Sequence, residues 1–115
     1  MEGRIVVAAA PYGEFRLLHT HFGRLRGLLG CGRDAPAVLL APCHAIHTFG
    51  MRIPIDVAFV DRQGRIALAR RGLLPGRHLS QRGSVAVFER PSQDAPWFQA
   101  EEWVQIVWGH GIGKE

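Results

Sequence analysis

The run IDVAFVDRQGRIALARR, residues 55–71, constrains the fold of this chain more than any other segment. Two runs expected to form β-strands flank a short polar loop that contains Gly64, which is the pattern of a β-hairpin. Both faces of the first stretch, Ile55 to Val60, are apolar. A strand of this kind is covered on both sides. The pattern therefore predicts a mainly β fold, a sandwich or closed barrel, with this strand in its middle.

Turn residues divide the rest of the chain into further short elements. We expect strands at residues 3–9, 14–19, 37–41, 84–89 and 103–108. Thr20 can cap a short helix with apolar residues at spacings of three and four, and the stretch 72–83, rich in glycine and proline, is expected to be a long exposed loop. The prediction is a single domain, 1–115: a compact antiparallel β-sandwich or barrel-like domain with one or two short helices.

The composition excludes several classes of protein. Apolar residues make up 47% and charged residues 21% of the chain, which is ordinary globular usage and argues against disorder or a coiled coil. No stretch approaches the roughly 18–20 apolar residues of a membrane span, and the first residues do not resemble a signal peptide. We therefore expect a cytoplasmic protein in which Cys31 and Cys43 are thiols.

The net charge of +4 comes from 13 arginines and a single lysine. Arginine binds phosphate or carboxylate through two parallel hydrogen bonds, so an anionic partner is compatible with this bias. The arginines are scattered along the chain, however, without the aromatic residues of an RNA-binding sheet or the pattern of a basic helix. Nucleic-acid binding therefore stands as an alternative, and a solvated arginine-rich surface is the simpler interpretation.

Residues 43–56, CHAIHTFGMRIPID, hold the densest set of reactive side chains. Thiolate and imidazole are ligands that zinc and copper prefer, which makes Cys43, His44 and His47 candidate metal ligands. No CxxC or HxxxH pair accompanies them, so a metal site is a minor alternative. In another alternative Cys43 is a nucleophile, activated by an imidazole and oriented by Asp56. No local signature accompanies that arrangement, and the sequence leaves it open whether the protein uses a cofactor.

Asp56 is more informative than the cysteine because it lies inside a run that should be buried. An unpaired buried charge is costly, so the carboxylate must have a partner. Backbone amides, Thr48, Arg52 and a histidine are the candidates. The simplest hypothesis is that Asp56 braces the fold.

The segments RLRGLLG (residues 24–30) and CHAIHTFGMRIPIDVAFVDRQGRI (residues 43–66) together resemble the domain of unknown function 192 family of bacteria and archaea. The resemblance implies a mainly antiparallel β-fold with one or two short helices, and it implies no activity. Downstream, VAVFERPSQDAP keeps the family's glutamate as Glu89 but lacks its following glycine. The matching positions are Arg24, Gly27, Leu28, His47, Thr48, Met51, Pro54, Asp56 and Gly64.

Three functional hypotheses follow. The first is a small non-catalytic binding or accessory module, whose polar site lies in the loop before the core hairpin and binds a small molecule or a protein. The second is a metal- or thiol-dependent enzyme that uses Cys43, His44, His47 and Asp56. The third is arginine-mediated nucleic-acid binding. For the first hypothesis the site residues are His47, Thr48, Met51, Arg52 and Asp56.

Overall fold

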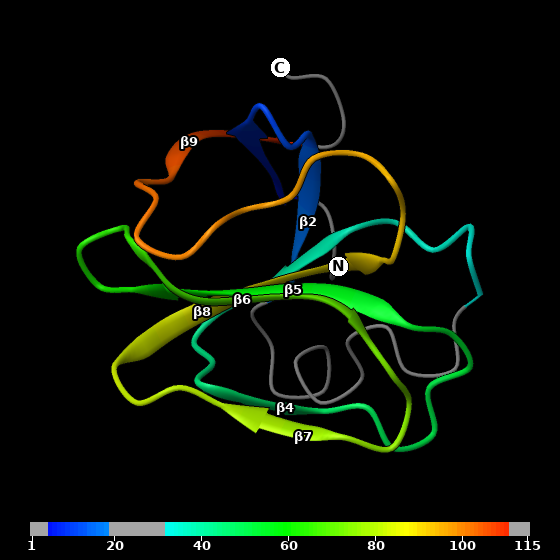
Figure 1. Cartoon of the computed structure of the whole chain (residues 1–115). Coiled ribbons are helices and arrows are strands. Elements are labelled where there is room, and N and C mark those ends of the chain that lie inside the picture. Colours follow the sequence, from blue (N-terminus) through cyan, green and yellow to red (C-terminus); the bar gives the residue numbers. More distant parts are fainter. Residues whose placement is uncertain (1–4, 19–31, 111–115) are drawn as a thin grey trace.

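The computed structural model describes residues 5–18 and 32–110, and side chains as far as residue 105. These residues form nine strands and no helix. Seven strands make one sheet in the order β6-β5-β8-β3-β2-β1-β9, and β4 pairs with β7 in a second, two-stranded sheet (Figure 1). The strands are β1 (Ile5–Ala10), β2 (Glu14–Leu18), β3 (Val38–Leu40), β4 (Ala45–His47), β5 (Ile55–Asp61), β6 (Ile66–Leu73), β7 (His78–Ser80), β8 (Ser84–Pro91) and β9 (Gln105–His110).

This architecture confirms the prediction of a mainly β fold. All strand pairs are antiparallel except β2 with β3, which run parallel. The predicted exposed loop 72–83 contains β7, because its residues pair with β4, a strand that the sequence did not indicate. The predicted helix after Thr20 lies outside the described residues, as do the family positions Arg24, Gly27 and Leu28.

Strand β5 lies in the middle of the fold, as its apolar sequence predicted. Residues Ile55 to Val60 are all buried. On one face, strands β1 and β2 pack over β5 and β8 around Phe15, Phe88 and Trp97. On the other face, Val57 and Phe59 pack against Ile46 of β4 in a second apolar cluster. The central strands therefore lie between two layers (Figure 1).

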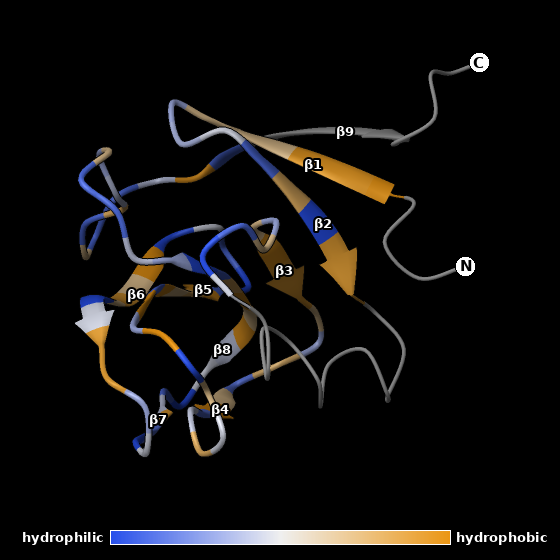
Figure 2. Ribbon diagram, turned by 90° about the vertical axis from the view of Figure 1, so that its right-hand side faces the viewer, coloured by the Kyte–Doolittle hydropathy of each residue, from blue (hydrophilic) through white to orange (hydrophobic). Residues whose placement is uncertain are grey.

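The outer strands show the alternation expected of a half-covered sheet. In β2, Phe15 and Leu17 are buried while Glu14 and Arg16 are exposed. Figure 2 shows this alternation as changes of colour along the strand. At the far edge, Ile66 of β6 exchanges backbone hydrogen bonds with residues 101–102, just before β9. The large sheet therefore curls until the segments at its two ends meet.

A buried ion pair joins the two central strands. Asp56 and Arg90 stand directly opposite each other in the β5–β8 ladder, and Arg90 Nε donates a hydrogen bond of 2.9 Å to Asp56 Oδ2. The two side chains are 0% and 5% exposed. A bulge in β6 opposite Asp56 leaves the Gly72 N–H to donate to Asp56 Oδ1 at 2.9 Å. A backbone amide is thus a partner of Asp56, as predicted, whereas the charge partner is a residue that the sequence did not suggest.

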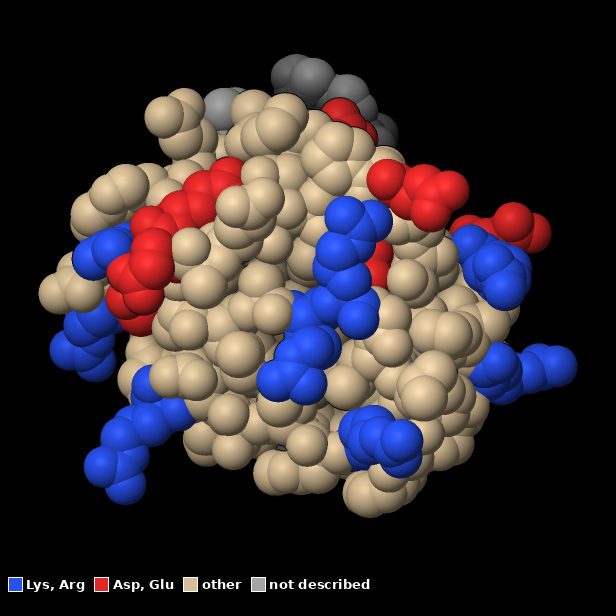
Figure 3. All heavy atoms as spheres, viewed as in Figure 1, with Lys and Arg blue, Asp and Glu red and all other residues tan. Residues whose placement is uncertain are grey.

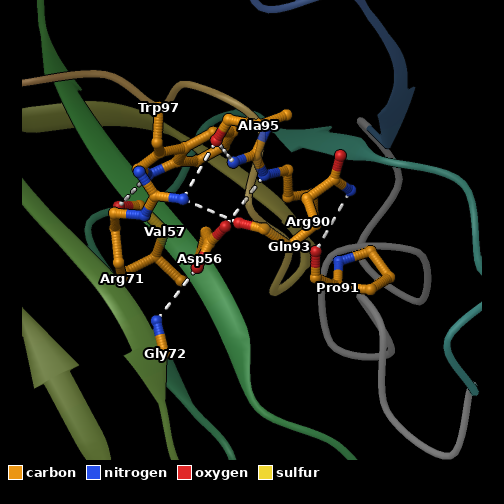
Figure 4. A network of polar contacts seen from close by, with 9 residues as sticks. All are labelled: Asp56, Val57, Arg71, Gly72, Arg90, Pro91, Gln93, Ala95 and Trp97. Carbon is orange, nitrogen blue, oxygen red and sulfur yellow. Dashed lines mark hydrogen bonds and ion pairs between the residues drawn. The ribbon is translucent and has the colours of Figure 1, made fainter.

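The same arginine fixes the segment that follows β8. Its guanidinium lies 4.4 Å from the centre of the Trp97 ring, and its Nη2 donates to the Ala95 carbonyl at 2.7 Å. Trp97 in turn donates its indole N–H to the Val57 carbonyl at 2.9 Å. Arg71 adds hydrogen bonds to the carbonyls of Gln93 and Ala95 (Figure 4). The irregular residues 92–97 are therefore held against the central strands by polar contacts.

We predict that Asp56→Leu destabilises the protein by about 3–5 kcal/mol, because it leaves the Arg90 guanidinium buried without its counter-charge. The double variant Asp56→Leu, Arg90→Leu removes both charges and should recover at least part of this loss. Urea unfolding of the wild type, both single variants and the double variant measures the coupling. Strictly additive losses would contradict the prediction.

Candidate functional site

The structure places the five predicted site residues in separate environments. His47 and Arg52 are exposed, whereas Thr48 and Asp56 are fully buried. Met51 belongs to the apolar cluster between β4 and β5. Asp56 bonds to Arg90 in the ladder of the large sheet, while His47 lies in the small sheet. The five side chains therefore do not line one common cavity.

Thr48 joins two turns that lie far apart in the sequence. Its hydroxyl donates to the Leu74 carbonyl at 2.7 Å and accepts a hydrogen bond from the Arg77 N–H at 2.8 Å. Its backbone also bonds to Arg77 and Gly76. The side chain is 0% exposed. Thr48 thus fixes the turn after β4 against the turn before β7.

An exposed surface, which we call the Phe49 surface, lies around this pair of turns. Phe49 and Leu74 are 55% and 51% exposed. Phe49 follows Thr48 in the chain, and Leu74 supplies the carbonyl that Thr48 binds, so the two residues belong to adjoining turns. The Phe49 ring stacks on His47, with ring centres 5.4 Å apart. We define the surface as Phe49, Leu74, His47, Arg77 and His78.

The surroundings of the Phe49 surface are basic. Arg52 and Arg77 are exposed close to Phe49 and Leu74 in the chain, and the acidic residues nearest to these turns in the sequence are Asp56 and Asp61. Asp56 is buried in its ion pair, and Asp61 accepts hydrogen bonds from backbone N–H groups of its own hairpin loop. In Figure 3, the lower part of the visible face, over β4 and β7, shows basic and no acidic side chains. This surface therefore favours negatively charged partners.

The residues of the enzyme hypothesis are also placed apart. Cys43 is half-buried against the apolar cluster, and its thiol donates to the Ala45 carbonyl at 3.3 Å. His44 is exposed. Within the described ranges, no group of three or more histidine, cysteine, aspartate or glutamate side chains is arranged to hold a metal ion. Cys31 lies outside those ranges.

Glu89 is a further candidate functional residue, which the sequence indicates only through the family resemblance. It stands between Val57 of β5 and Val38 of β3 and is 5% exposed, and its carboxyl group accepts no hydrogen bond from another described residue. Burial raises the pKa of the Glu89 carboxyl from its ordinary value of 4.5 to about 7. Perturbed carboxyls of this kind occur at functional sites.

Two hollows lie elsewhere on the surface. One, of about 160 Å³, is lined by Arg33, Ile53, Pro54, Pro91 and Ser92. The other, shallower and wider, lies between the β5–β6 and β7–β8 turns and includes Arg62 and Arg82. Neither contains a residue of the predicted site, and neither contains Glu89.

Thr48→Val is expected to cost about 2 kcal/mol of unfolding free energy, because it keeps the shape but leaves the Arg77 N–H and the Leu74 carbonyl without their hydroxyl partner. Thr48→Ser retains the hydroxyl and should cost clearly less. Denaturant unfolding compares the two variants. Equal losses in both would show that the hydrogen bonds do not hold the turns.

For Glu89 we predict that stability falls as the pH rises from about 4.5 to about 7. In this range the unfolded chain releases the carboxyl proton while the folded chain keeps it. Glu89→Gln removes this dependence, so above pH 7 the variant should be more stable than the wild type by about 3 kcal/mol. The two proteins should converge near pH 4. Denaturant unfolding at pH 4, 6 and 8 measures the difference, and a constant difference would contradict the shift.

Comparisons with known proteins show the fold. The sequence matches no protein-family model and no curated protein. A crystal structure of a protein of unknown function from Novosphingobium aromaticivorans aligns with 77% of this chain and 72% of its own, with 20% identity and a TM-score of 0.57. A "putative transcription regulator" from Sinorhizobium meliloti aligns with 80% of this chain and 81% of its own, with 18% identity and a TM-score of 0.61. The described residues include no helix long and apolar enough to cross a membrane. The chain thus has the fold of these two proteins.

Proposed function

We propose that this chain is a small non-catalytic binding module of the domain of unknown function 192 type, and that it binds an acidic segment of a partner protein on the Phe49 surface. The observation that carries the proposal is the exposure of Phe49 and Leu74 on two turns that Thr48 fixes together. The proposal keeps the cytoplasmic location expected from the sequence.

Large apolar side chains that are held exposed to water are unfavourable unless a partner covers them. Only Phe49, Leu74 and Trp103 are large hydrophobic residues exposed among the side chains that the structure describes. Two of these three belong to the Phe49 surface. Rigid turns that present an aromatic and an aliphatic side chain are suited to an anchor contact, because little conformational freedom is lost on binding.

Charge supports the choice of an acidic partner. Arg77 and Arg52 are exposed on the segments that adjoin Phe49, and the acidic side chains of this part of the chain are already engaged. Complementary charge raises the association rate and selects against basic partners. The combination of an apolar anchor with arginine at its rim favours a protein segment over nucleic acid. An exposed aliphatic side chain such as Leu74 would contribute little to contacts with a phosphate backbone.

The test begins with a displayed library of random 12-residue peptides, selected on the wild-type chain and counter-selected on a Phe49→Ser variant. We expect selected peptides to be rich in aspartate and glutamate around one apolar residue. In fluorescence polarisation with a selected peptide, Phe49→Ser and Leu74→Ser should each weaken binding by about tenfold or more, the effect of losing an anchor contact. Arg77→Ala should weaken binding less and reduce its salt dependence.

Trp103→Ser is the matched control, because Trp103 is exposed to a similar degree but lies before β9 and stacks on Arg65. It should bind the selected peptide as the wild type does. A labelled DNA duplex provides the competing outcome. Tight, salt-sensitive duplex binding that survives Phe49→Ser, with no peptide selected, would overturn the proposal in favour of nucleic acid.

A further inference from the structure

Two histidines that are 31 residues apart in the sequence face each other across the small sheet. His47 of β4 and His78 of β7 are direct partners in the antiparallel register, between the pairs Ala45 with Ser80 and Thr48 with Arg77. The sequence hypothesis for a metal site combined His47 with Cys43 and His44. The structure supplies a different neighbour, which no sequence spacing indicates.

The hydrogen bonds of the ladder show which kind of pair this is. The Thr48 N–H donates to the Arg77 carbonyl at 2.7 Å, and the Gln81 N–H donates to the His44 carbonyl at 2.9 Å. Hydrogen-bonded pairs alternate with non-hydrogen-bonded pairs in an antiparallel ladder, so His47 and His78 occupy a non-hydrogen-bonded position. Directly opposed residues at such a position have Cβ atoms about 4.5–5.5 Å apart.

Both imidazoles lie on the solvent side of the small sheet. His47 and His78 are exposed, whereas the preceding pair, Ile46 and Leu79, packs into the apolar cluster against β5. Side chains alternate between the faces of a strand, so the two histidines share the outer face. Thr48 and its hydrogen bonds fix the backbone at this end of the ladder. Two exposed imidazoles on a fixed backbone are available to bind the same ion.

We propose that His47 and His78 together bind one divalent transition-metal ion, with water or a partner's side chain at the remaining coordination positions. Neutral imidazole is a common ligand for copper, nickel and zinc, and affinity for such nitrogen ligands is highest for Cu²⁺. The described residues provide no third ligand at this position, so the coordination sphere is open. The proposal does not depend on the partner proposed above.

Metal binding and the Phe49 surface share one side chain. The His47 ring stacks on Phe49. The Phe49 side chain supplies no ligand to the ion. Phe49→Ala therefore should not weaken metal binding, although it removes the proposed peptide anchor. The two proposals can thus fail separately.

The experiment uses the untagged full chain and Cu²⁺ or Zn²⁺, with affinity measured by competition against a chelator of known strength. His47→Ala and His78→Ala should each weaken binding by about tenfold or more, because one of two ligands is lost. His44→Ala is the matched control. His44 is an exposed histidine of the same segment, but it does not lie opposite His78 in the small sheet. It should bind as the wild type does.

Electron paramagnetic resonance of the Cu²⁺ form supplies a second readout that does not depend on affinity. The wild type should show coupling to two imidazole nitrogens, and each single variant should show coupling to one. Variants at positions 47 and 78 that bind Cu²⁺ as tightly as the wild type, with unchanged spectra, would place the ion elsewhere and overturn the proposal. Circular dichroism of each variant confirms that the fold is intact.

Discussion

The ion pair between Asp56 and Arg90 is the interaction on which the arrangement of the other elements depends. It joins the two central strands at their apolar face, where each charge alone would be strongly unfavourable. The same carboxylate accepts the Gly72 N–H at the β6 bulge, and the same guanidinium packs on Trp97. One pair of side chains thereby contacts both the edge strand β6, through Gly72, and the irregular segment 92–97, through Ala95 and Trp97. A hydrophobic pair in its place would offer packing but none of these directional contacts.

The candidate surface is a consequence of how the second face of β5 is covered. The apolar residues on that face need a covering layer, and the short strands β4 and β7 provide part of it through Ile46 and Leu79. Because these strands pair with each other, their outer faces and adjoining turns are presented to solvent together. His47, Phe49, Leu74 and His78 come from two segments of sequence and are neighbours only because the small sheet exists. The small sheet therefore covers the core with one face and carries the proposed binding surface on the other.

Much of the fold could be predicted from local patterns. The hairpin at residues 55–71 and the burial of both faces of β5 follow from apolar runs and turn residues, as do β1, β2, β3 and β8 in approximate position. The strands β4 and β7 could not be found in this way. Each has only three residues, AIH and HLS, which is too short to show an alternation of apolar and polar residues. The contacts of the site were harder to predict, because they join residues far apart in the sequence. The apolar neighbours of Asp56 indicate that its carboxylate needs a partner, but nothing near it in the sequence indicates Arg90, 34 residues away. Likewise the pairing of His47 with His78 is fixed by register alone.

The two-stranded sheet shares no hydrogen-bonded ladder with the seven-stranded one. It is attached through side-chain packing, through the Thr48 bonds to the adjoining turn, and through a backbone bond from Cys43 to Val85. A unit attached in this manner can detach and reattach while the large sheet stays intact, at a free energy below that of global unfolding. We therefore expect residues 45–51 and 74–80 to open locally at a lower free energy than the seven-stranded sheet. A ligand that contacts both strands of this unit would suppress its opening. Binding would then make residues 45–51 and 74–80 more ordered without changing the overall shape of the protein.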